Sequence, residues 1–224
     1  MTRRFQTRQW CIFLGGLSNE NLYFDRTNNG LQKYAEDYGF FLIGLAAYGV
    51  STFFGSLIPI LQTLDGIDPS ADPQNPEDWP EETLAVRHLA DLAGIGMLEE
   101  IFSKWNIDRK NVFGQGNSAG SNACIYFALR DPSLFNAIVP TGGFVNINFA
   151  DLSKLRETPV MHIVGTEDQF GITDIKKVYQ RLEELKVPLT IKIVGGGDHY
   201  FGWTKAVADI FAFMEAHVVR EEMQ

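Results

Sequence analysis

Gly116-Asn117-Ser118-Ala119-Gly120 is the stretch that decides the fold of this chain, since it reads G-x-S-x-G between an apolar run and a helical run. Residues 110–114 are predicted to end a buried strand, and residues 121–129 to form a buried helix. Small residues around Ser118 permit a sharp strand-to-helix turn that lifts the serine side chain clear of the backbone. The motif therefore predicts a nucleophile at Ser118, against the alternative of a glycine-rich turn whose serine only caps the helix.

A serine nucleophile needs a histidine to accept its proton, and the chain has four histidines. His199 follows the apolar run 190–194 and the flexible stretch 195–198, which predicts a loop at the C-terminal end of a strand. The other three lie in predicted helices or in mid-strand, where packing or a surface position explains them better: His88, His162 and His217. His199 is the candidate base, and the alternative is a solvent-facing loop histidine.

The base needs a carboxylate to orient it, and Asp168 follows directly on the apolar run 160–164. Glu167 and Asp198 are the competing acids, each on a different loop path. The order Ser118, Asp168, His199 is that of the α/β-hydrolases and differs from the orders in chymotrypsin-like and subtilisin-like proteases. Three separate loops are thus predicted to meet at one site.

Apolar runs alternate with helical periodicity along the rest of the chain, which predicts an α/β fold with a mostly parallel sheet of about six strands and helices on both faces. Helical stripes with i, i+3, i+4, i+7 spacing lie between the expected strands. At 224 residues and 45% hydrophobic content, a single domain over residues 1–224 is expected, with 51–80 as a lid-like or pocket insertion. The expected strands are 9–14, 39–46, 110–114, 136–140, 160–165 and 190–194.

The charge and cysteine content restrict the partners and the location of the protein. A net charge of −9 would repel nucleic acid and anionic membrane surfaces, and no apolar stretch approaches the roughly 20 residues of a membrane helix. Cys11 and Cys124 lie on predicted buried elements without metal-type spacing, so neither a disulfide scaffold nor a metal site is expected. Residues 1–17 could mimic a signal peptide, but their apolar part is short and they lack a small-x-small cleavage site, which favours a cytoplasmic location with secretion as the alternative.

Several stretches resemble the polyhydroxybutyrate depolymerase and feruloyl esterase branch of the α/β-hydrolases. The similarity is most specific over 107–120 and extends over 131–138, 142–143 and parts of 19–49. This resemblance implies an α/β-hydrolase fold and hydrolysis of small-molecule carboxylic esters without a cofactor. It also implies nucleophile, acid and base roles for Ser118, Asp168 and His199.

The loop after the first predicted strand departs from that branch. Its members usually carry His-Gly ahead of the oxyanion loop, whereas this chain reads Phe13-Leu14-Gly15-Gly16, with Leu14 in place of the histidine. Because the oxyanion donors are backbone amides, Gly16 or Leu17 is still expected to act together with Ala119.

The predicted sheet also departs from the usual fold, because the strand at 9–14 corresponds to its third strand and no sequence remains for the first two. The strand at 39–46 would then expose an apolar edge without a lysine or proline to blunt it. A homodimer or larger assembly that covers this edge is therefore expected.

The sequence is also compatible with functions other than that of a serine esterase that forms an acyl-enzyme. A catalytically weak or inactive binding protein on a hydrolase scaffold is one, because fold does not imply function and Leu14 is unusual. A thioesterase or peptidase would use the same triad. A dinucleotide site on Gly114-x-Gly116-x-x-x-Gly120 is disfavoured, because the glycine spacing is wrong and the next strand, 136–140, carries no acid.

Overall fold

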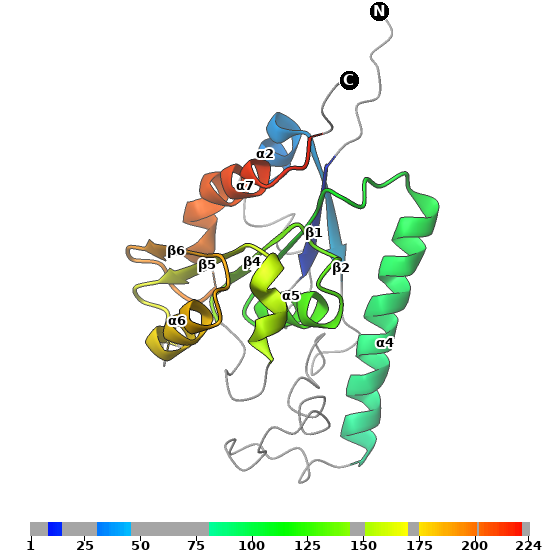
Figure 1. Cartoon of the computed structure of the whole chain (residues 1–224), viewed down its shortest axis with the longest axis horizontal. Coiled ribbons are helices and arrows are strands. Elements are labelled where there is room, and N and C mark those ends of the chain that lie inside the picture. The colour runs from blue at the N-terminus through cyan, green and yellow to red at the C-terminus, as the bar shows by residue number, and fades with distance from the viewer. Residues whose placement is uncertain are drawn as a thin grey trace, which may run out of the picture.

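The fold is taken from a computed structural model that describes residues 9–14, 31–45, 81–143, 151–169, 175–200 and 202–220. Within these segments six strands form one sheet in the order β2-β1-β3-β4-β5-β6, and each neighbouring pair is parallel (Figure 1). The predicted α/β fold with a parallel sheet is confirmed. The strands are β1 Gln9–Leu14, β2 Phe40–Leu45, β3 Val112–Asn117, β4 Ala137–Thr141, β5 Val160–Gly165 and β6 Leu189–Val194.

Helices cover both faces of this sheet, as predicted (Figure 1). The α-helices are α2 Leu31–Tyr38, α4 Glu81–Lys104, α5 Ala119–Arg130, α6 Ile175–Glu184 and α7 Val207–Ala216, and two 3₁₀ helices are η3 Leu152–Glu157 and η4 Gly202–Ala206. One core cluster joins α2 and α7 to the sheet, and the other joins α4, α5 and α6 to it. The sheet is therefore the middle layer of three.

The central strands are buried along their whole length, which fits parallel strands covered on both faces. Along β3 the pleat sends neighbouring side chains to opposite faces, so that Val112 packs in the cluster with α5 and Phe113 in the cluster with α7. Phe113, Phe127 and Phe211 are among the largest fully buried side chains, each stabilising the fold by about 1.5–3 kcal/mol.

The predicted end of β3 at residue 114 was wrong, because the strand continues to Asn117. Gly114 lies within the strand at a point where two side chains approach its backbone closely. A Cβ on Gly114 would lie 3.0 Å from Cys124 Sγ and 3.1 Å from the Phe135 ring. Gly114 is therefore a site of close packing inside the strand and not a strand breaker, and β3 ends directly before Ser118.

β2 is one edge of the described sheet, and within the described segments no strand pairs with its outer side. Phe40 and Leu45 at its ends are buried, whereas the Phe41 side chain is 39% exposed. The expected edge therefore exists in this part of the chain and is partly apolar. The predicted insertion at 51–80 lies outside the described residues.

Candidate active site

The turn between β3 and α5 presents Ser118 as the motif predicts. Ser118 has φ 56° and ψ −117°, a strained conformation for a residue with a side chain. Its backbone N–H donates to the Thr141 carbonyl at 2.9 Å, which fixes the turn to the end of β4. The helix-capping alternative is wrong, because the Ser118 side chain makes no capping hydrogen bond to α5.

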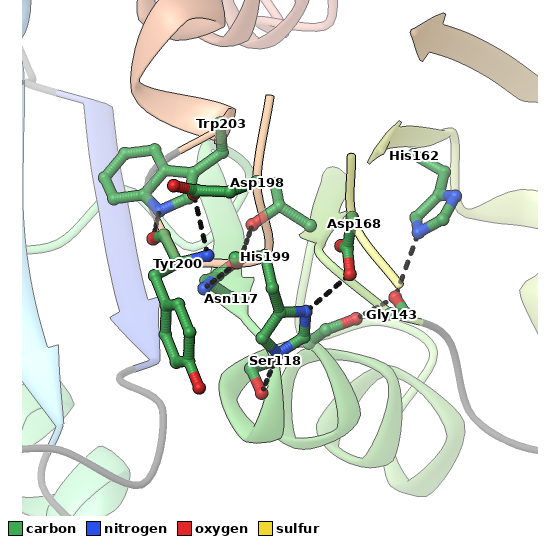
Figure 2. Close-up of polar contacts among 11 residues, drawn as sticks. Asn117, Ser118, Gly143, His162, Asp168, Asp198, His199, Tyr200 and Trp203 are labelled. Atoms are coloured by element: carbon green, nitrogen blue, oxygen red, sulfur yellow. Dashed lines mark hydrogen bonds and ion pairs between the residues drawn. The ribbon is translucent and has the colours of Figure 1, made fainter. Parts of the chain in front are cut away.

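The Ser118 hydroxyl lies against the imidazole of His199, which in turn lies against Asp168 (Figure 2). His199 Nε2 is 2.8 Å from Ser118 Oγ, and His199 Nδ1 is 2.8 Å from Asp168 Oδ1. Since a carboxylate accepts, Nδ1–H donates to Asp168 and leaves Nε2 to accept from the serine hydroxyl. The three residues singled out from chain order are thus brought into one hydrogen-bonded line.

Burial separates Asp168 from the two competing acids. Asp168 is 1% exposed at the end of β5, whereas Glu167 and Asp198 are exposed. Asp198 Oδ1 accepts a hydrogen bond from the Tyr200 backbone N–H at 3.1 Å, which shapes the loop. The carboxylate that orients the imidazole in this structure is therefore that of Asp168.

Glycines let the His199 loop pack directly on the end of β5. A Cβ on Gly165 would lie 2.0 Å from the Gly197 carbonyl oxygen, so the two backbones touch where any side chain would intrude. The same carbonyl accepts from the Glu167 N–H at 2.9 Å. The loop that carries the histidine is thereby fixed to the loop that carries Asp168.

Asn117, the variable residue of the motif, ties the serine turn to the histidine loop. Its Nδ2 donates to the His199 carbonyl at 3.1 Å, and its Oδ1 accepts from Thr141 Oγ1 at 2.9 Å. Gly142, with φ 62°, sits so close that a Cβ there would lie 2.5 Å from Asn117 Oδ1. Sequence reasoning missed this residue, because the predicted strand ended at residue 114 and Asn117 was assigned to the turn, whereas it is the last residue of the buried strand.

His162 of β5 is a second histidine beside the site, and it is wholly buried (Figure 2). Its Nε2 lies 2.9 Å from the Gly143 carbonyl, which can only accept, so Nε2 carries the hydrogen. Nδ1 then accepts from the Tyr179 hydroxyl at 2.7 Å. Burial lowers the pKa of His162 from 6.5 to about 4, against the opposing effects of the Gly143 carbonyl and Asp168. His162 is therefore a neutral packing residue at neutral pH, as its mid-strand position suggests.

The expected oxyanion donors are only partly within the described segments. Ala119 is buried and is the first residue of α5, so its amide belongs to the first-turn N–H groups that have no partner inside the helix. These groups point toward the positive end of the helix dipole, where an oxyanion is stabilised. Gly16 and Leu17 lie outside the described residues, and so does the side chain of Leu14.

In the described segments, no three His, Cys, Asp or Glu side chains form a group that could hold a metal ion. Among the helices described, none is both long enough and apolar enough to span a bilayer.

Similarity to known proteins comes from solved structures, since neither a protein-family model nor a curated protein sequence matches the chain. A thermostable esterase aligns with a TM-score of 0.69 at 15% identity over 95% of this chain. An S-formylglutathione hydrolase from Agrobacterium tumefaciens aligns at 0.67 and 13% identity, covering 96% of this chain and 86% of its own. A ferulic acid esterase aligns at 0.67 and 15% identity, covering 95% of this chain and 86% of its own.

These alignments establish the fold class, which is that of the α/β-hydrolases. The chain spans 56% of the length of the thermostable esterase. At these identities the likeness shows the fold alone, because one fold serves many functions.

Proposed function

We propose that this protein is a serine hydrolase that cleaves small-molecule carboxylic esters through an acyl-enzyme. The observation that carries the proposal is the line of two 2.8 Å contacts from Ser118 through His199 to Asp168, built on a strained serine turn. A hydroxyl, an imidazole and a buried carboxylate in this order activate the hydroxyl for attack on a carbonyl. Esterases and other hydrolases among the solved structures of the same fold support the same chemistry.

The reaction follows from the positions of the three side chains. Ser118 Oγ attacks the ester carbonyl carbon as its proton passes to His199 Nε2. Asp168 stabilises the imidazolium through Nδ1–H. The C–O bond to the alcohol then breaks, and His199 returns the proton to the departing alcohol oxygen. Water repeats these steps on the acyl-enzyme and releases the acid.

The oxyanion formed in each step needs hydrogen-bond donors beside Ser118. The Ala119 amide is one proposed donor, because it follows the nucleophile and opens α5. Gly16 or Leu17 is the second proposed donor. Loss of one such donor typically costs about 3–4 kcal/mol of transition-state stabilisation, so turnover is expected to be sensitive to the loop in which Leu14 replaces the usual histidine.

The serine assignment is tested with an alanine variant and a fluorophosphonate probe. Wild type should react with the probe and hydrolyse p-nitrophenyl acetate, and Ser118→Ala should lose both, with turnover reduced on the order of 10³-fold or more. His199→Ala should lose about as much, and the double variant should lose little further. Ser121→Ala is the matched control, because Ser121 is a nearby buried serine whose hydroxyl bonds the Gly143 carbonyl at 2.6 Å. Full activity in Ser118→Ala would refute the proposal, and a wild type inert to probe and ester would favour the inactive binding protein.

The acid is tested by neutralising one carboxylate at a time. Asp168→Asn should lower turnover by about 10⁴-fold while the protein stays folded, because the imidazole loses the partner that sets its tautomer. Asp198→Asn and Glu167→Gln should have mild effects, since both side chains are exposed. Thioester and peptide substrates with the same acyl group show which leaving group the site prefers.

A further inference from the structure

Tyr200 follows His199 in the chain and places an aromatic ring beside the imidazole (Figure 2). The two ring centroids are 5.3 Å apart, and the rings meet edge to face at 83°. Although it makes this contact, Tyr200 is 60% exposed. Most of the ring surface is therefore open to whatever occupies the mouth of the site.

Hydrogen bonds at the N–H and the carbonyl of Tyr200 fix its backbone, so the loop sets the point from which the ring projects. Its N–H donates to Asp198 Oδ1 at 3.1 Å, and its carbonyl accepts from Trp203 Nε1 at 3.1 Å. Trp203 is 2% exposed and anchors this carbonyl to the core. An exposed aromatic side chain on a fixed backbone is suited to contact a ligand at low entropic cost.

The chemistry places the alcohol part of an ester next to this ring, an argument that rests on the proposed function. When the tetrahedral intermediate collapses, His199 Nε2 must give its proton to the alcohol oxygen, which requires that oxygen to lie about 3 Å from Nε2. The acyl group remains on Ser118 and extends away from the imidazole. The atoms beyond the alcohol oxygen therefore lie on the side of His199, where Tyr200 flanks the ring.

We propose that Tyr200 is a specificity-determining residue that binds the alcohol portion of the ester. Its exposed ring takes a flat aromatic alcohol group in a stacked or edge-to-face contact, so the protein prefers esters of aromatic alcohols to esters of small alkyl alcohols with the same acid. The acyl group makes no use of this contact. Tyr200 therefore acts on formation of the acyl-enzyme and leaves its hydrolysis unchanged.

The test compares benzyl acetate with ethyl acetate, which form the same acetyl-enzyme and release alcohols of similar basicity. The ratio of kcat/KM for benzyl acetate to that for ethyl acetate is measured in wild type, Tyr200→Ser and Tyr200→Phe. Tyr200→Ser should lower the ratio about 3- to 10-fold, the range expected for loss of one aromatic contact. Tyr200→Phe should keep the wild-type ratio, because the ring remains. Trp105→Ser is the matched control, since Trp105 is an equally exposed aromatic residue (60%) just after α4.

Two further readouts separate alcohol binding from an effect on the base. Release of acetate from the preformed acetyl-enzyme should proceed at the wild-type rate in Tyr200→Ser, and acetyl transfer to benzyl alcohol over ethanol should fall by the same factor as the kcat/KM ratio. Equal losses for both esters, together with slower acetate release, would mean that the ring only orients His199 and would overturn the proposal. A Tyr200→Phe ratio as low as that of Tyr200→Ser would overturn it as well, in favour of a hydroxyl contact. If wild type hydrolyses neither ester and does not react with the fluorophosphonate, the proposed function itself is refuted. If wild type is active and Tyr200→Ser leaves the ratio unchanged, only the role of Tyr200 is refuted.

Discussion

The neutral, buried state of His162 makes the stability of this protein depend on acid pH. The pKa of the His162 imidazole is about 4 in the folded protein, against 6.5 when the ring is in water. Because the folded pKa is lowered, the unfolded chain takes up a proton between these values that the folded protein does not. The stability contributed by this group is therefore complete above pH 6.5 and is lost as the pH falls toward 4.

The size of the loss follows from the difference between the two pKa values. Within this window the free energy of unfolding falls by about 1.4 kcal/mol for each pH unit. The loss from His162 is small at pH 7, about 2 kcal/mol at pH 5 and about 3 kcal/mol at pH 4. A typical domain has a free energy of unfolding of about 5–15 kcal/mol, so the loss from this one side chain is a measurable fraction of the total.

The perturbation that isolates this effect is His162→Gln, which removes the titration and keeps an amide to donate to Gly143 and accept from Tyr179. Urea unfolding followed by tryptophan fluorescence at pH 7 and pH 5 should show wild type losing about 2 kcal/mol more than the variant. Ser121→Ala is the control, because it removes the other donor to the Gly143 carbonyl and leaves His162 in place. The free energy of unfolding of this variant should be about 1 kcal/mol lower than that of wild type at both pH values, with the same dependence on pH. An identical pH dependence in wild type and His162→Gln would refute the reasoning.

Two other predictions concern the Asn117 contact and the open sheet edge. Asn117→Leu removes the donor to the His199 carbonyl and should lower kcat/KM on the order of 10²-fold. Asn136→Leu is the control: it removes an equivalent bond to the His217 carbonyl and should lower stability in a urea assay without lowering kcat/KM. Equal losses of activity in the two variants would contradict a positioning role for Asn117. We expect a homodimer or larger assembly that buries roughly 1,200 Å² or more at this edge. Light scattering at micromolar concentration should report the mass of that assembly, and Phe41→Lys on the β2 edge should dissociate it while Ile193→Lys on the β6 edge should not. A stable wild-type monomer would count against the interface.

The sequence predicted the fold well because its signals are local. Apolar runs located each strand within about two residues at most ends, and the glycine-serine motif located the turn at Ser118. Asp168 and His199 could be named because each lies in the loop that follows a strand, and the carboxyl ends of parallel strands meet at one edge of the sheet. The exception was β3, whose end was predicted at Gly114, a glycine that packs closely against Cys124 of α5 and lies inside the strand.

The contacts that fix the site could not be predicted, because they join distant parts of the chain. The Asn117 side chain reaches a carbonyl 82 residues away, and His162 bonds the carbonyl of Gly143, 19 residues before it. Neither partner is a side chain, so no residue type at a set spacing marks the pair. The close approach of Gly165 to Gly197 also has no signal in the sequence, because a glycine in a loop normally indicates only a turn.

The two histidines near Asp168 show that environment, rather than residue type, decides which one is suited to carry a proton. Both ring nitrogens of His162 lie against neutral groups, a carbonyl and a hydroxyl, and the complete burial of the ring disfavours its charged form. His199 instead has a carboxylate on Nδ1 and a serine hydroxyl on Nε2, with 12% of its side chain still exposed. In the proposed mechanism, the imidazolium formed at His199 lies directly against the Asp168 carboxylate. The same carboxylate favours charge on His162 only as the weakest of the influences on it, and burial prevails. In the proposed mechanism the proton of Ser118 therefore passes to His199, while the neutral imidazole of His162 donates to the Gly143 carbonyl.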